Sequence, residues 1–174
     1  MSRSALLASA HASAQNLGWQ AQDRWLLCLP LAHTGGLSIV IRCLLARQSV
    51  MLFEPGPGGV LTHITELARA ASSATLISLV PSVLSALLDA GFQPPAALRA
   101  VLLGGAGCSP ALAQRAHAAR VPLLTSYGLT ETASQVVTRR YAERFERVDG
   151  DWTFKRRLVV VDSNLLPGEF TELL

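Results

Sequence analysis

Residues 75–128 read TLISLVPSVLSALLDAGFQPPAALRAVLLGGAGCSPALAQRAHAARVPLLTSYG, and this stretch decides the fold. It holds three short apolar runs, at residues 75–80, 98–103 and 121–125, and a segment with helical spacing follows each of the first two. Pro81 and Pro110 fall in the first turn of the predicted helices, where a proline costs no hydrogen bond, and Ser109 is a suitable N-cap. Strands that alternate with helices predict a parallel sheet.

The same alternation extends toward the N-terminus. Helices are predicted over residues 4–16, 37–46 and 61–71, and strands over residues 25–29 and 49–53. All of the predicted strands are apolar along their length, which is typical of strands buried on both faces. We therefore predict an α/β fold in which helices cover both faces of a parallel sheet.

The chain changes character after Thr138. Residues 139–151 are polar and charged, two short strands are predicted at residues 152–154 and 158–161, and a helix could begin within residues 167–174. We place a domain boundary after Thr138 on this change in composition.

Composition limits the possible functions. Half of the residues are apolar and 16% are charged, which argues against a disordered chain. The basic residues behind the net charge of +3 are scattered up to Arg120 and then cluster at residues 139–140 and 155–157, and we interpret them as solvated surface charge and not as a nucleic-acid surface. Cys28, Cys43 and Cys108 form no CxxC pair, so we expect reduced core cysteines in a cytoplasmic protein. We expect neither a signal peptide nor a membrane span, because no apolar run is long enough.

Ligands of open parallel sheets bind at the carboxyl ends of the strands, and residues 126–132 (SYGLTET) follow such an end. Tyr127 offers a flat ring for stacking, and Gly128 permits close approach to the backbone. Thr130 and Glu131 supply a hydroxyl for a phosphate and a carboxylate for a magnesium ion. The alternative is a plain turn followed by a helix start, which these residues alone favour slightly.

Three further features lie at the same predicted edge or beside it. Gly104 and Gly105 follow a buried strand, where exposed backbone N–H groups can bind an anion, although such a turn is a weak signal alone. His33 lies beside two glycines at another strand end and either lines a pocket or is structural. Arg42 lies on an otherwise apolar helix, where its charge either extends to water or meets a carboxylate ligand.

Taken together, three segments in this order resemble the adenylate-forming (AMP-dependent) acyl-CoA synthetase superfamily. SYGLTET resembles the family's YGxTE signature, LLGGAGCSPAL (residues 102–112) its glycine segment, and LPLAHTGG (residues 29–36) its PxxHxxG segment. Residues 23–46 and 128–138 are most similar to the o-succinylbenzoate–CoA ligases of menaquinone biosynthesis. The alternative of an unrelated α/β scaffold requires all three matches to be coincidental.

The resemblance implies a role for each matching residue. Tyr127 would stack on adenine, Thr130 would contact the adenylate phosphate, and Glu131 would hold magnesium. His33 would line or gate the acyl pocket, and Arg42 would bind the free carboxylate of the substrate. Thr130, Glu131 and His33 would thus be the catalytic set. The remaining nucleotide-binding positions would be Gly104, Gly105, Ala106, Ser126 and Gly128.

The implied reaction is AMP-forming ligation of an acyl or aromatic carboxylate to coenzyme A, with ATP and Mg²⁺. Residues 1–138 would be a partial AMP-binding domain, and residues 139–174 a remnant of the hinge and of the small C-terminal domain. The family's phosphate loop and C-terminal lysine have no counterpart in this sequence, and Glu143 stands where a ribose-binding Asp is usual. The alternatives are a catalytically inactive remnant or a nucleotide- or acyl-binding module, with oligomerisation or a complementing fragment covering an exposed apolar edge.

Overall fold

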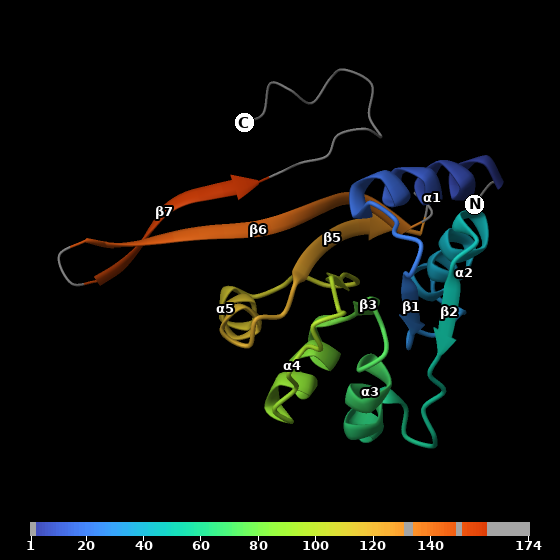
Figure 1. The fold of residues 1–174 in the computed structure, drawn as a ribbon, viewed down its shortest axis with the longest axis horizontal. Coiled ribbons are helices and arrows are strands. Elements are labelled where there is room, and N and C mark those ends of the chain that lie inside the picture. Colours follow the sequence, from blue (N-terminus) through green and yellow to red (C-terminus); the bar gives the residue numbers. More distant parts are fainter. Residues whose placement is uncertain (1–2, 131–133, 149–150, 160–174) are drawn as a thin grey trace.

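The computed structural model describes residues 3–130, 134–148 and 151–159 (Figure 1). The helices are α1 (Arg3–Leu17), α2 (Thr34–Ala46), α3 (Ile64–Ala71), α4 (Pro81–Asp89) and α5 (Pro110–Ala118), and a short 3₁₀ helix, η1, spans Val60–His63. The strands are β1 (Arg24–Leu27), β2 (Ser49–Leu52), β3 (Leu76–Leu79), β4 (Ala100–Leu103), β5 (Leu123–Leu129), β6 (Ser134–Val148) and β7 (Asp151–Val159).

All seven strands form one sheet in the order β2-β1-β3-β4-β5-β6-β7. The first five are parallel, whereas β6 pairs antiparallel with β5 and forms a hairpin with β7. Figure 1 shows this hairpin extending away from the helices. The parallel part of the sheet is therefore the part that can present strand ends to a ligand.

The side chains of the parallel strands alternate between two cores. Trp25 and Leu27 of β1 pack in one core with Ile39 and Cys43 of α2, while Leu26 packs in the other core with residues of α3, α4 and α5. A strand needs apolar side chains on both faces to lie between two layers of helices. The predicted α/β architecture with helices on both faces is confirmed.

The start of helix α2 differs from the prediction because of a close backbone contact. Helix α2 begins at Thr34, not at residue 37, and its first turn includes two glycines that we had expected before the helix. At Gly36 a Cβ atom would lie 2.4 Å from the carbonyl oxygen of Pro30. Glycine is therefore needed there for the helix to pack against the preceding loop, and it does not end the helix.

The C-terminal strands also differ from the prediction. β5 continues through Leu129, so residues 126–129 are strand and not a turn, whereas Thr130 is in a turn and the alternative helix start at Glu131 lies outside the described residues. β6 supplies their backbone partners, with a register shift between Tyr127 and Gly128. Residues 139–148 of the polar segment belong to β6. One strand, β7, includes residues 152–154 and 158–159, where we predicted two short strands, whereas residues 160–161 and the helix start predicted within residues 167–174 lie outside the described residues. Strand β6 was missed because most of its residues are polar and do not alternate with apolar ones, whereas pairing with a neighbouring strand can hold such a segment in strand conformation.

Two features complete the framework. Ser109 caps α5 as predicted, with its Oγ accepting a hydrogen bond of 3.2 Å from the backbone N–H of Leu112. At the amino edge of the sheet, the buried carboxylate of Asp23 accepts hydrogen bonds from Arg99 and Thr75 and so links the chain before β1 to the starts of β3 and β4. Within the described residues, no helix has the length and apolar character required to cross a membrane.

Candidate ligand-binding site

A cavity of about 570 Å³ lies at the carboxyl ends of the parallel strands and continues between α2 and the sheet. Parallel sheets of this kind bind their ligands at this edge. The described residues that line the cavity include no aspartate or glutamate. The lining consists of Cys28, Leu29, Pro30, His33, Thr34, Gly35, Gly36, Ser38, Arg42, Val60, Ser78, Leu79, Val80, Val83, Leu102, Gly104, Gly105, Ser126, Gly128, Leu129, Thr130 and Ser134.

Helix α2 forms one wall of the cavity with a row of small residues. Gly35, Gly36 and Ser38 leave space beside the sheet, and the hydroxyl of Ser38 is satisfied by the carbonyl oxygen of Gly35 at 2.9 Å. Arg42 follows one turn later on the same face of the helix. Because a helix rises 1.5 Å per residue, Arg42 lies about 12 Å along the helix from Thr34 at its start.

Arg42 is the most unusual side chain of the cavity. It is only 2% exposed, and its Nε and Nη2 atoms have no hydrogen-bond partner among the described residues. Its guanidinium lies over the ring of Trp25, 5.6 Å from the ring centre. Burial lowers the pKa of Arg42 to about 10, which still leaves it charged at neutral pH. The alternative in which Arg42 extends to water is wrong, and the cavity contains a buried cation without an acid.

The outer end of the cavity brings two distant segments together. The hydroxyl of Thr34, at the start of α2, donates to the hydroxyl of Thr130 after β5, at 3.3 Å. His33 precedes Thr34 and lines the same end with its exposed side chain. The two hydroxyl groups and the start of α2 therefore lie together at this end of the cavity, and the start of a helix is a favourable place for an anionic group.

The glycine segment after β4 packs against the start of the SYGLTET segment. Ser126 donates a hydrogen bond of 3.2 Å to the carbonyl oxygen of Leu103. A Cβ atom added at Gly104 would lie 2.7 Å from the Oγ atom of Ser126. Gly104 and Gly105 both line the cavity. A side chain at position 104 would thus displace Ser126 from the cavity wall.

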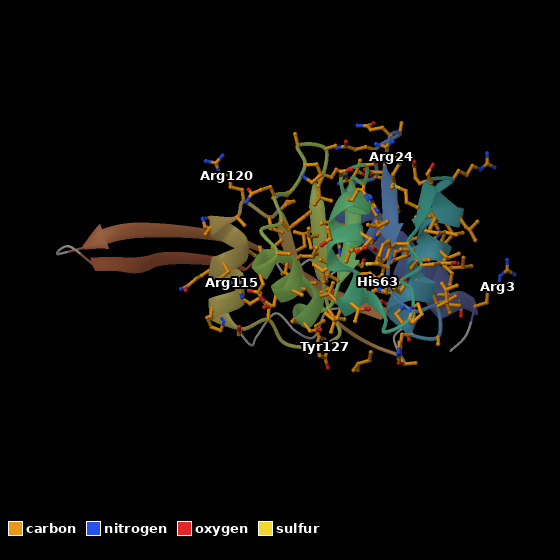
Figure 2. All side chains as sticks on the ribbon, turned by 90° about the horizontal axis from the view of Figure 1, so that it is seen from below. Arg3, Arg24, His63, Arg115, Arg120 and Tyr127 are labelled. Atoms are coloured by element: carbon orange, nitrogen blue, oxygen red, sulfur yellow. The ribbon has the colours of Figure 1, made fainter. Side chains whose placement is uncertain are left out.

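Some predicted site residues lie outside the cavity. Tyr127 is 62% exposed, and Figure 2 shows it at the edge of the molecule opposite Arg24, which begins β1. Ala106 is also exposed and does not line the cavity. Glu131 lies outside the described residues. Tyr127 is therefore available to stack on a group held outside the cavity, while Gly104, Gly105, Gly128 and Thr130 contact its interior.

The sequence analysis missed several residues of the site. Ser78 lines the cavity from the middle of β3 and accepts a hydrogen bond of 3.1 Å from the indole Nε1 of Trp25. A serine inside an apolar run was a signal that could have found it, because a buried hydroxyl needs a partner. Cys28 also lines the cavity and donates to the carbonyl oxygen of Ser78 at 3.4 Å. Burial raises the pKa of Cys28 to about 12, so the thiol is neutral and not a nucleophile.

The family model described as "AMP-binding enzyme" matches residues 1–169 of the chain. The chain belongs to the AMP-binding enzyme family. A curated member, the 2-succinylbenzoate–CoA ligase of Staphylococcus epidermidis, is 39% identical over 146 residues, which are 82% of this chain and 30% of that protein. The chain thus spans about a third or less of the length of the relatives it matches.

Solved structures of the family show the same fold. The o-succinylbenzoate CoA synthetase MenE of Bacillus subtilis in complex with ATP and magnesium ion is 31% identical, with a TM-score of 0.70. The same protein with the acyl-adenylate intermediate OSB-AMP gives the same two values. Each comparison covers 87% of this chain and 34% of the solved chain. Family membership therefore rests on sequence and on fold together.

Proposed function

We propose that this chain forms the acyl-binding part of an AMP-forming acid–thiol ligase, with o-succinylbenzoate as the acid. The observation that carries the proposal is the state of Arg42. Its guanidinium is buried beside a cavity of about 570 Å³ and has no acidic partner among the described residues. A buried charge is costly unless an opposite charge meets it. A ligand carboxylate would supply that charge, and an arginine fork suits a carboxylate well.

The shape of the cavity supports a ligand with two acidic ends. Arg42 lies about 12 Å along α2 from the hydroxyls of Thr34 and Thr130, so one carboxylate can lie deep while another reacts at the outer end. The wall between them is apolar, including Leu79, Val83 and Leu102, and suits an aromatic ring. o-Succinylbenzoate has two carboxylates joined by a ring and a short chain.

In the proposed reaction, a carboxylate oxygen forms a bond to the α-phosphorus of ATP while the bond to the β-phosphate oxygen breaks, so pyrophosphate leaves. The coenzyme A sulfur then attacks the acyl carbon, losing its proton, and the bond to AMP breaks. Thr130 would contact the phosphate at the outer end, beside Thr34 and His33. Tyr127, outside the cavity, would stack on adenine, and the backbone of Gly104, Gly105 and Ala106 would border it.

Magnesium would neutralise charge on the phosphates during the first step. Within the described residues, no group of three His, Cys, Asp or Glu side chains could hold a metal. Mg²⁺ in nucleotide sites is usually held by one or two carboxylates together with substrate phosphates. We propose Glu131, which follows Thr130 in sequence, as that carboxylate.

Isothermal titration calorimetry tests the acyl site directly. We expect the chain to bind o-succinylbenzoate and Arg42→Met to weaken that binding by about 10- to 100-fold, because a hydrogen-bonded charge contributes about 1.5–3 kcal/mol. Arg47→Met is the matched control, since Arg47 is an exposed arginine at the end of the same helix. Equal affinities of Arg42→Met and the unmodified chain would contradict the proposal.

A second measurement separates turnover from binding alone. Pyrophosphate release with o-succinylbenzoate, ATP and magnesium reports the first chemical step. Release that depends on Arg42 supports the ligase, whereas binding without release supports the alternative of an acyl- or nucleotide-binding module.

A further inference from the structure

A buried chain of contacts lies behind the guanidinium of Arg42. Trp25 is completely buried in β1, and its ring lies beneath Arg42 with 5.6 Å between the guanidinium carbon and the ring centre. The indole Nε1 of Trp25 donates to Ser78 Oγ at 3.1 Å, so β3 fixes the rotation of the ring. Trp19 packs edge-on against the same ring, with centroids 5.6 Å apart. The ring beneath Arg42 is therefore held on two sides.

This arrangement differs from the usual way of burying an arginine. A carboxylate partner would satisfy the guanidinium but would also compete with any acidic ligand. An aromatic face attracts the cation without occupying the N–H groups at its rim. Nε and Nη2 of Arg42 indeed have no hydrogen-bond partner among the described residues, whereas the buried indole N–H of Trp25 does.

We infer that Trp25 is a positioning residue that stands in place of a counterion, so that Arg42 stays charged, fixed and free to bind a carboxylate deep in the cavity. Ser78 would contribute by fixing the ring. This inference rests on the proposed function for the identity of the natural ligand, but the preference for a carboxylate belongs to the pair of Trp25 and Arg42. Selectivity for an acid with a second carboxylate would follow from that pair.

The test uses benzoate as a probe of Arg42 alone. Its binding to the full chain is followed by the NMR signal of the Arg42 Nε–H group, which is assigned by its absence in Arg42→Met. We expect Trp25→Leu, which removes the aromatic face, to weaken benzoate binding by about tenfold, and Trp25→Phe, which keeps a weaker face, by about threefold. Trp19→Leu is the matched control, because it removes an aromatic ring from the same cluster without removing the face beneath Arg42.

Two outcomes would overturn the inference. One is unchanged benzoate affinity in Trp25→Leu, and the other is an equal loss in Trp19→Leu, which would show that any disturbance of this core has the same effect. If Trp25→Leu does not fold, Trp25→Phe decides, and wild-type affinity in that variant rejects the role of the indole.

A second titration distinguishes the role of Trp25 from the identity of the natural ligand. Titration with o-succinylbenzoate and with its two analogues that each lack one carboxylate gives the discrimination between an acid with two carboxylates and an acid with one. We expect Trp25→Leu to lose most of that discrimination while binding the analogue that lacks the deep carboxylate within about twofold of the wild type. If none of these acyl compounds binds while benzoate affinity still depends on Trp25, the proposed function fails and the inference stands.

Discussion

Replacement of Asp23 by alanine should be among the most destabilising changes in the chain. The Asp23 side chain is fully buried and accepts hydrogen bonds from the backbone N–H of Gln20 at 2.8 Å, from Thr75 Oγ1 at 2.8 Å and from Arg99 Nε at 2.8 Å, with a further bond from Arg99 Nη2. Removal of one partner of a buried ion pair usually costs about 3–5 kcal/mol. Because Arg99 is 22% exposed and can recover some hydration, we expect about 3 kcal/mol.

Urea unfolding of Asp23→Ala measures this loss, and the chain offers a matched control. Arg115 and Asp89 form the other described ion pair, but their side chains are 43% and 67% exposed. Exposed pairs contribute about 0–1 kcal/mol, so Asp89→Ala should change the free energy of unfolding by no more than that. Similar losses in the two variants would refute the view that burial gives the Asp23 network its importance.

The same network predicts a dependence on pH. Burial alone would raise the pKa of Asp23, but hydrogen bonds from Arg99, from the Gln20 backbone and from Thr75 outweigh it and lower the pKa below its usual value. A carboxyl whose pKa is lowered by folding stabilises the protein fully above its unfolded pKa, about 3.9, and this contribution is lost as pH falls toward the folded pKa. The difference in stability between the wild type and Asp23→Asn should therefore shrink below about pH 4.

Three further predictions concern the site and its framework. Gly36→Ala should lower the free energy of unfolding by about 1–3 kcal/mol, since its Cβ would lie 2.4 Å from the Pro30 carbonyl oxygen, whereas Gly107→Ala, with open space around it, should be nearly neutral by thermal unfolding. Ser109→Ala should cost about 1 kcal/mol by the same measurement, because it removes the cap of α5. Alkylation followed by mass spectrometry should modify the half-buried Cys108 well before Cys28 and Cys43, whose pKa values burial raises to about 12.

Local chemistry was sufficient to predict most of the parallel sheet. The apolar runs located β3 within one residue at each end, and the prolines located the first turns of α4 and α5, because these signals act through neighbouring residues. Gly36 misled the prediction of α2, since its reason is a contact with Pro30 that only the fold reveals. β6 was missed because a hairpin strand is stabilised by its partner and not by its own composition.

The candidate site was predictable where a residue stood at a strand end. Thr130 and Gly104 were found by that rule, and both line the cavity. Ser78 and Trp25 were not found, because the contact of Trp25 with Arg42 and its hydrogen bond to Ser78 join residues that are distant in the sequence. Tyr127 lies outside the cavity, which pattern alone could not reveal.

Asp23, which precedes β1, and Arg42, on helix α2, are two buried charges with different surroundings. Asp23, at the amino edge, is satisfied by several donors, so its removal should cost stability. Arg42, which lines the cavity, has two nitrogen atoms without a partner among the described residues, so Arg42→Met should leave the free energy of unfolding unchanged or raise it while weakening carboxylate binding. A site that keeps an unsatisfied charge loses stability until a ligand supplies the missing partner. Opposite changes in stability for Asp23→Ala and Arg42→Met, measured by urea unfolding without ligand, would distinguish a framework charge from a ligand-binding charge.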